Sequence, residues 1–309
     1  MRVRLPEVVR MLGTAFKAWW DDNAPRLGAS LAFYTLFAIA PVLLVAIAIA
    51  GAVFGPEAVR GQIAGEIEYL VGRQGARAVQ SLLQGASQSK GSVVATIIGA
   101  ITFVLTSTGA FLELQAALNN IWRVTPRPGV NIKAFLIDRL RSFGLVVSMG
   151  FLLTVSLAVS AALAAVAGWL ERRAPGMPLL LGALDWFLSI AVTTALFALL
   201  FRFLPDVRLR WRDVPTGAFV TAILFTIGKQ LIGLYLGQGS TASSYGAAGS
   251  VMVLLLWVYY VSQLVLLGAE FTRVYTRRHG SKPQPESFAE KAPRQKSGQG
   301  ALDGIAPSH

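Results

Sequence analysis

The feature that most constrains this chain is a series of six long apolar runs, each close to the length that crosses a lipid bilayer. A transmembrane helix needs ~20 consecutive apolar residues. Only 14% of the residues are charged, whereas a soluble domain carries about 25%. The sequence therefore predicts an all-α fold, that of a polytopic membrane protein with six transmembrane helices. The predicted spans are residues 31–54, 93–112, 142–170, 179–204, 214–236 and 249–269.

Three further segments precede, interrupt or follow this transmembrane domain of residues 31–270. Residues 1–30 place apolar and aromatic side chains at helical spacing, which predicts an amphipathic helix in the cytoplasmic interface. A soluble helix packed on cytoplasmic loops is the alternative. Residues 55–92 hold two short apolar stripes and predict amphipathic helices on the external face. Residues 271–309 are basic, and from residue 281 they lack any periodic pattern, which predicts a largely disordered cytoplasmic tail.

The distribution of basic residues predicts the orientation of the spans. If both termini are cytoplasmic, 21 of the 28 Lys and Arg residues lie in cytoplasmic segments and six lie outside. Membrane proteins carry their excess of Lys and Arg on the cytoplasmic side. We therefore expect a multi-pass protein with both termini in the cytoplasm.

Lys229 is the single formal charge in the 23-residue run 214–236. A charge at the bilayer centre costs about 2.5–3.5 kcal/mol on insertion scales, so the lysine is expected to face the bundle interior and find a partner. Asp185, on the preceding antiparallel span, lies at a similar predicted depth, and we hypothesise an ion pair that lines a cavity. The alternative is that Lys229 extends its stem to the headgroups. The other polar candidates for a substrate site within the spans are Gln230, Gln263 and Thr106.

A second polar layer is predicted at the cytoplasmic ends of the spans. Its members carry charges of both signs, so they could form a ring of ion pairs that acts as a gate. Single charged residues at span ends are also common interfacial anchors, and this alternative stays open. The gate candidates are Glu113, Arg202, Glu270 and Arg26.

Several classes of chemistry lack the residues they require. The chain has no cysteine, its two histidines are His279 and His309, and its carboxylates form no close-spaced set. We therefore expect no metal site, no cofactor and no enzymatic activity. A nuclease without metal would need a histidine acid–base pair, and none is evident. No phosphate-binding loop of the G-x-x-x-x-G-K-[ST] type is present, so no ATP site is expected.

Four stretches together resemble one family. They are "NAPRLGASLAFYTLFAIAP" (23–41), "LELQAALNNIWRV" (112–124), "LPDVRLRWRDVPTGAF" (204–219) and "YGAAGSVMVLLLWVYYVSQLVLLGAEFTRVY" (245–275). They are similar to the YihY/virulence factor BrkB family of bacterial inner-membrane proteins, which was once labelled ribonuclease BN. The resemblance implies six transmembrane helices, a bacterial inner membrane and a suspected role in transport or lipid handling, and it carries no agreed catalytic set. Residues in the matching motifs include Asn23, Pro25, Asn119, Trp122, Tyr245, Gly246, Gly249 and Trp257.

Two functions follow as expectations. The first is a transporter or lipid-handling protein for an anionic substrate, either a small molecule or a lipid, because a lysine within a span suits an anion. The second is a membrane scaffold that transports nothing, in which the charges only fix helix register. Membrane lipids are the expected partners in both cases. No nucleic-acid partner is expected, since the orientation rule already accounts for the basic loops.

Overall fold

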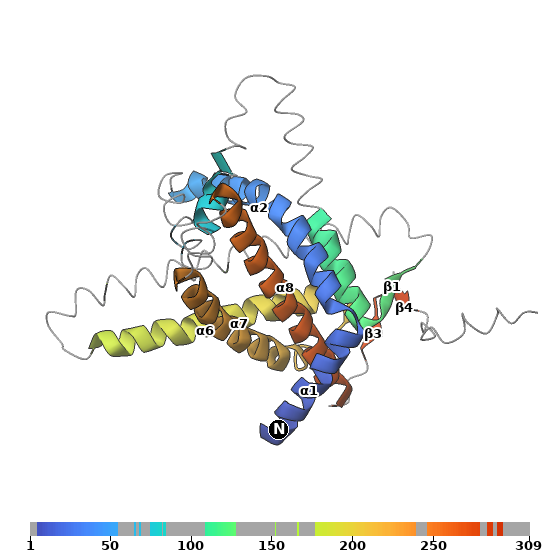
Figure 1. The fold of residues 1–309 in the computed structure, drawn as a ribbon. Helices are drawn as coiled ribbons and strands as arrows, with labels where there is room; N and C mark the ends of the chain where they lie inside the picture. Colours follow the sequence, from blue (N-terminus) through green and yellow to red (C-terminus); the bar gives the residue numbers. More distant parts are fainter. Residues whose placement is uncertain are drawn as a thin grey trace, which may run out of the picture.

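The computed structural model describes a chain built mainly from long helices (Figure 1). The described residues are 5–54, 109–127, 177–238, 246–278, 283–286 and 289–292, with short helical pieces at 65, 68, 75–81, 83, 84, 152 and 166. The predicted spans 93–112 and 142–170 therefore lie almost wholly outside the described residues, as does most of the external loop 55–92. Helices along most of the described chain agree with the predicted α-helical class of membrane protein.

The first two helices meet at a tight corner. Helix α1 covers Leu5–Asp21 and α2 covers Ala24–Phe54. Asn23 has a φ of 54°, in the left-handed region that asparagine tolerates better than most residues. Pro25 follows in the first turn of α2, where proline's missing N–H leaves no hydrogen bond unmade. The corner ends the amphipathic helix and starts α2 seven residues before the predicted span at residue 31.

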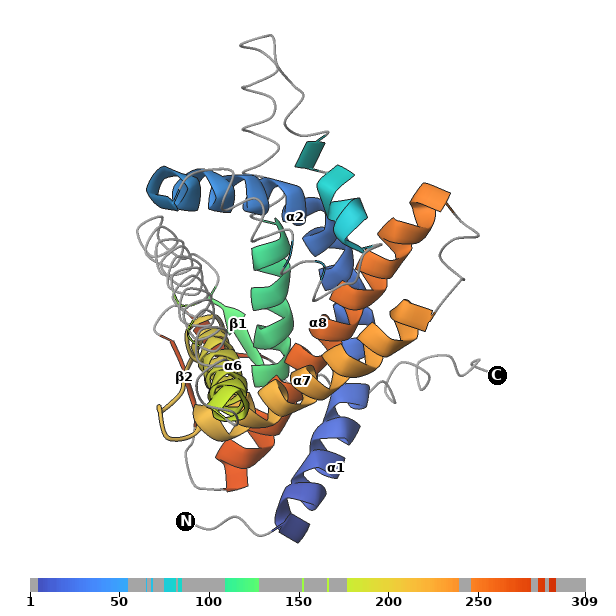
Figure 2. The same ribbon diagram turned by 90° about the vertical axis from the view of Figure 1, so that its left-hand side faces the viewer.

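Three later helices form the centre of the described fold. They are α6 at Met177–Phe203, α7 at Val214–Gln238 and α8 at Gly246–Arg278. Helix α8 packs against α1, α2 and α7, and α6 packs against α7 (Figures 1 and 2). Within these helices, Gly182–Phe203, Val214–Leu231 and Val251–Arg278 are long and apolar enough to cross a membrane, and Ala24–Ile39 is a shorter apolar helix.

Small residues allow α7 and α8 to approach closely. The side chain of Thr272 on α8 occupies the space above Gly217 on α7, where an added Cβ would lie 1.9 Å from the threonine Oγ1. One helical turn further along α7 the threonine and the glycine exchange helices: Oγ1 of Thr221 on α7 lies 1.9 Å from the Cβ position of Gly268 on α8. Glycine and threonine pairs of this kind bring helix backbones together in membrane proteins.

Two short antiparallel strand pairs involve part of the segment that is predicted as a largely disordered tail; most of that segment lies outside the described residues, so the prediction itself stays untested. Strand β1 (Val124–Pro126) pairs with β4 (Ala289–Lys291), and β2 (Val207–Arg208) pairs with β3 (Gln284–Pro285). We call residues 283–292 the C-terminal strap. Its backbone also bonds outside the strands, since Glu286 N donates to Asp206 O at 3.0 Å and Ala292 N donates to Arg123 O at 2.9 Å. Composition does not indicate these strand pairs because the strap's partners lie 76 or more residues away in the sequence, the nearest being Arg208 opposite Gln284.

Candidate functional site

The α1–α2 corner presents a buried carboxylate to the rest of the fold. The backbone at Asn23 N bonds to Trp20 O at 3.1 Å, and that at Asp22 N bonds to Ala18 O at 2.9 Å. This turn directs the side chain of Asp22 inward, where 5% of it is exposed. A buried carboxylate requires compensating donors or cations.

Arg273 on α8 joins that carboxylate to two other parts of the chain. Its Nη1 lies 3.2 Å from Asp22 Oδ2 and also donates to the carbonyl oxygen of Ile121. Its Nη2 lies 2.8 Å from Oε2 of Glu270, three residues earlier on the same helix. Arg123, beyond the end of the helix over residues 109–122, donates from Nη2 to Asp22 Oδ1. We call Asp22, Arg123, Glu270 and Arg273 the Asp22 cluster.

Glu270 is the most deeply buried member of the Asp22 cluster. Its side chain is 0% exposed, and neither of its carboxylate oxygens accepts a hydrogen bond from any described residue. The short contact with Arg273 is therefore an ion pair without hydrogen-bond alignment. The formal charges of the four residues cancel, but Glu270 depends on a guanidinium that Asp22 shares.

Arg123 reaches the cluster through an unusual backbone conformation. Its φ of 57° lies in the left-handed region, which costs a non-glycine residue about 1–3 kcal/mol unless the surroundings compensate. The conformation ends the helix over residues 109–122 and turns the chain into β1. The ion pair to Asp22 and the bond from Ala292 to the Arg123 carbonyl are the compensating contacts.

A second buried carboxylate fixes the connection between α6 and α7. Asp206 Oδ1 accepts from Gln115 Nε2 at 2.9 Å, and Asp206 Oδ2 accepts from Asn119 Nδ2 at 2.7 Å. Asn119 returns the bond, since its Oδ1 accepts from Asp206 N at 2.8 Å. All three residues are buried, so this group fastens the α6–α7 connection to the helix over residues 109–122.

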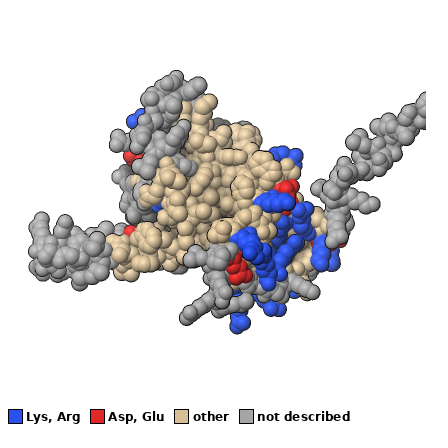
Figure 3. All heavy atoms as spheres, turned by 60° about the horizontal axis from the view of Figure 1, so that its bottom comes forward, with Lys and Arg blue, Asp and Glu red and all other residues tan. Residues whose placement is uncertain are grey.

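Lys and Arg side chains gather at one end of the face shown in Figure 3. Most exposed Lys and Arg residues come from α1, the start of α2, the chain after residue 122, the α6–α7 connection, the end of α8 and the strap. Much of the rest of the described surface in this view is uncharged. Such an uneven distribution is typical of one membrane face. The exposed basic residues in the described chain are Arg10, Lys17, Arg26, Arg77, Arg123, Arg127, Arg208, Arg210, Arg212, Arg277, Arg278 and Lys291, of which Arg77 lies in the segment 55–92 that separates the first two predicted spans.

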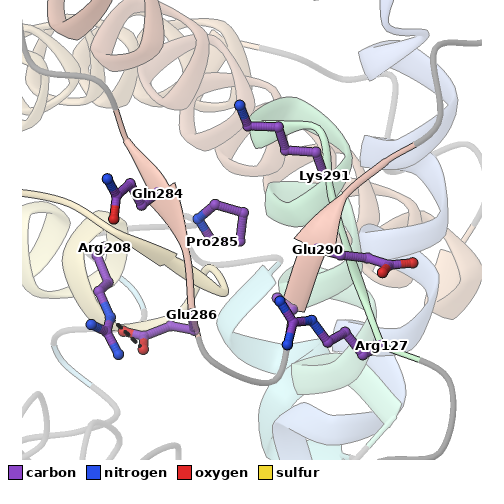
Figure 4. A pocket seen from close by; sticks show the side chains of 8 residues that line it. Arg127, Arg208, Gln284, Pro285, Glu286, Glu290 and Lys291 are labelled. Atoms are coloured by element: carbon purple, nitrogen blue, oxygen red, sulfur yellow. Dashed lines mark hydrogen bonds and ion pairs between the residues drawn. The ribbon is translucent and has the colours of Figure 1, made fainter.

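An open hollow of about 710 Å³ lies beside the strap on this end (Figure 4). Arg208 and Glu286 point toward each other there, with Arg208 Nε 2.9 Å from Glu286 Oε2. The lining side chains come from short strands, and the Arg208 side chain is 62% exposed. The Asp22 cluster, which is buried and lies at a helix junction, is the better candidate for function.

The gate candidates fall in different places. Glu270 lies at the centre of the Asp22 cluster, as described above. Arg26 is exposed in the first turn of α2, and Glu113 is half-buried on the helix over residues 109–122. Arg202 lies against the rings of Phe203 and Trp211 instead of joining the cluster. The cluster partners Asp22, Arg123 and Arg273 were not among the gate candidates, although each lies in or beside a stretch that resembles the family.

The candidates within the spans are spread over three helices. Lys229 on α7 and Asp185 on α6 are both half-buried, and Gln230 is exposed. The α6–α7 contact between Phe197 and Phe225, with ring centroids 5.9 Å apart, sets the register of the two helices. Lys229 lies about one helical turn after Phe225, whereas Asp185 lies more than three turns before Phe197. The ion pair between Lys229 and Asp185 stays a prediction.

Gln263 and the family-motif residues occupy packing positions where they are described. Gln263 on α8 lies against Gly28 on α2, and its side-chain amide has no hydrogen-bond partner among the described residues. Trp122 is buried, and Trp257 is buried against Phe225 with ring centroids 6.0 Å apart. Asn23 and Pro25 form the α1–α2 corner, Asn119 bonds to Asp206, and Gly246 and Gly249 lie in the first turn of α8. Thr106 and Tyr245 lie outside the described residues.

No group of three or more His, Asp or Glu side chains that could hold a metal ion occurs in the described part of the chain. The site therefore consists of ion pairs and amide–carboxylate bonds at the ends of apolar helices. Together with the helices long enough to cross a bilayer, it defines the class: an α-helical membrane protein with a charged junction where its helix ends meet.

The chain belongs to the Virulence factor BrkB family, whose model matches residues 15–293. Similar curated proteins are named UPF0761 membrane proteins. Those of Ralstonia nicotianae, Rhodospirillum centenum and Verminephrobacter eiseniae are 30%, 31% and 32% identical to it, over 86%, 87% and 81% of this chain. The chain spans 58% of the length of each of these three relatives. No solved structure matches it.

Proposed function

We propose that this chain forms the membrane domain of a protein that moves or handles an anionic substrate in the bacterial inner membrane. In this proposal six helices span the bilayer, and both termini and the basic face lie in the cytoplasm. The gathering of exposed Lys and Arg residues at one end supports this orientation.

The observation that carries the proposal is the placement of Lys229. The lysine lies within the candidate span Val214–Leu231 and is half-buried, on a helix whose neighbouring Ile227 and Leu231 are 52% and 61% exposed. A cation kept at membrane depth on the inner side of an apolar helix is a natural contact for a phosphate or carboxylate. The substrate class is therefore an anion, either a lipid headgroup or a small organic acid.

The Asp22 cluster supplies the cytoplasmic closure in this proposal. It ties the α1–α2 corner, the chain after residue 122 and the end of α8 through two arginines. Because Glu270 has no aligned hydrogen bond, its ion pair can be replaced without loss of other bonds when α8 moves. The cluster thus acts as the gate, with Arg123 and Arg273 in the roles that Arg26 and Arg202 were expected to fill.

The alternative is a scaffold that transports nothing. The observation in its favour is the tight packing of α7 on α8 through Gly217 and Gly268, which leaves little freedom for helix movement. In this reading the ion pairs only fix the register of the helices.

Reconstitution distinguishes the two functions. The full chain is placed in liposomes with a fluorescent phosphatidylglycerol, and the rate of its movement between leaflets is measured by quenching from outside. Transport predicts faster movement than in protein-free vesicles and at least a tenfold loss in Lys229→Ala, with Lys17→Ala on the exposed face of α1 as the matched control. A second arm follows uptake of a soluble organic anion. If neither anion moves faster than in empty vesicles, the transport proposal fails and the scaffold replaces it.

A further inference from the structure

Arg202 has an environment that neither the gate nor the packing of the helices explains. It lies in the last turn of α6, with its guanidinium carbon 6.0 Å from the ring centroid of Phe203 and 5.6 Å from that of Trp211. The two rings meet edge to face, with their centroids 5.7 Å apart. Contact with two ring faces holds the guanidinium in one orientation.

Both rings are large apolar groups that are more than half exposed. Phe203 is 53% exposed and Trp211 is 52% exposed. The candidate span Gly182–Phe203 ends at Phe203, so in a bilayer that this span crosses both rings would lie near the headgroups. Tryptophan is enriched at this depth because its ring is apolar while its N–H needs a polar partner.

Arg202 also has unused hydrogen-bonding capacity. Its Nε is buried and lacks an acceptor, and within the described chain it forms no ion pair. An arginine presents five N–H donors in a fixed fork that matches phosphate oxygens. Arg210 and Arg212 lie on either side of Trp211 and are exposed, so they add positive charge around the same spot. The surroundings thus offer cations and apolar surface at headgroup depth.

We propose that Arg202, Phe203 and Trp211 form a binding site for the phosphate of an anionic phospholipid in the leaflet where α6 ends. The guanidinium fork binds the phosphate, the two rings contact the glycerol and the first acyl carbons, and Arg210 and Arg212 raise the local concentration of anionic lipid. A lipid satisfies both halves of the site at once, the charged arginine and the exposed rings, whereas a soluble phosphate leaves the rings in contact with water. The site does not depend on the transport proposal, because it lies on the outer surface of the helices.

Native mass spectrometry of the full chain in detergent tests the site, with phosphatidylglycerol and phosphatidylcholine as probes. The wild type is expected to retain phosphatidylglycerol more tightly than phosphatidylcholine. Arg202→Gln is expected to weaken phosphatidylglycerol binding about tenfold, because glutamine lacks both the positive charge and the fork of N–H donors that match the phosphate. Arg202→Lys should fall between the two, because it keeps the charge and loses the stacked fork.

The matched control is Arg278→Gln, which removes one exposed charge from the end of α8 and should change binding by less than twofold. The proposal is overturned if Arg202→Gln binds phosphatidylglycerol as the wild type does, or if Arg278→Gln loses as much. It is also overturned if glycerol 3-phosphate binds as tightly as the lipid. Trp211→Leu gives an independent reading if Arg202→Gln does not fold: a loss of about threefold supports the site, and unchanged binding refutes it.

Discussion

The Asp22 cluster gives the sharpest prediction for stability, through the variant Arg273→Met. Methionine keeps much of the apolar stem and removes only the guanidinium group. Glu270 then loses the cation 2.8 Å from its Oε2, while Asp22 loses one of two arginines. Removing one partner of a buried ion pair costs about 3–5 kcal/mol, because the remaining charge stays uncompensated. The hydrogen bond to the Ile121 carbonyl is lost as well, so we expect a value at the upper end.

The second variant isolates the uncompensated charge. In the Arg273→Met background, Glu270→Gln removes the buried carboxylate charge and should recover about 2 kcal/mol, within the usual coupling of contacting residues. The assay is unfolding by sodium dodecyl sulfate in a mild detergent, followed by tryptophan fluorescence, with free energies compared at one detergent ratio. Arg277→Met is the matched control, since Arg277 lies one turn further along α8 and is exposed. Equal losses for Arg273→Met and Arg277→Met, or no recovery in the double variant, would refute the electrostatic account.

Three other variants test the packing of the fold. Gly217→Ala should lower the free energy of unfolding by about 1–3 kcal/mol, because the added Cβ would lie 1.9 Å from Thr272 Oγ1. The control Gly182→Ala should be neutral in the same unfolding assay, because nothing lies within 4 Å of its Cβ position. Asn119→Ala removes both of its bonds to Asp206 and should cost about 2–3 kcal/mol. Asn120→Ala loses one contact of 3.4 Å, and a comparable loss there would contradict the role of Asn119. A chain that stops after residue 292 should melt like the full chain, whereas one that stops after residue 282 loses β3 and β4 and should melt at a lower temperature; identical melting of the two would show that the strap contributes nothing.

The long apolar helices could be predicted because hydrocarbon imposes a length and a composition on any helix that crosses it. The predicted spans 179–204 and 214–236 end within two residues of α6 and α7. The helix that contains the predicted span 249–269 is longer than the span, since α8 runs from Gly246 to Arg278. The apolar run that defines this span ends at the first charged residue, Glu270, but the Glu270 side chain is buried and lies beside Arg273. Composition alone cannot show that a charged residue has a partner.

The Asp22 cluster could be predicted only in part. Charge of both signs at the ends of the spans indicated ion pairs, and Glu270 does lie in one. The other carboxylate that Arg273 binds, Asp22, lies 251 positions away in the sequence. These two residues meet because the chain turns through left-handed conformations at Asn23 and Arg123. Neither turn has a local signal as strong as a glycine. The structure is therefore needed to choose among the many arginines that could have met this carboxylate.

The C-terminal strap has a mechanical consequence for anything attached beyond it. The family match ends at residue 293, one residue past the last bonded position of the strap at Ala292. Its strands pair with the segments that follow the helix over residues 109–122 and α6. The chain after residue 292 therefore starts from a residue whose backbone is hydrogen-bonded to Arg123 and that directly follows strand β4. A force or a binding partner acting on the strap would therefore act at once on the end of the helix over residues 109–122 and on the end of α6. Through the backbone of Arg123 it would also act on the Asp22 cluster.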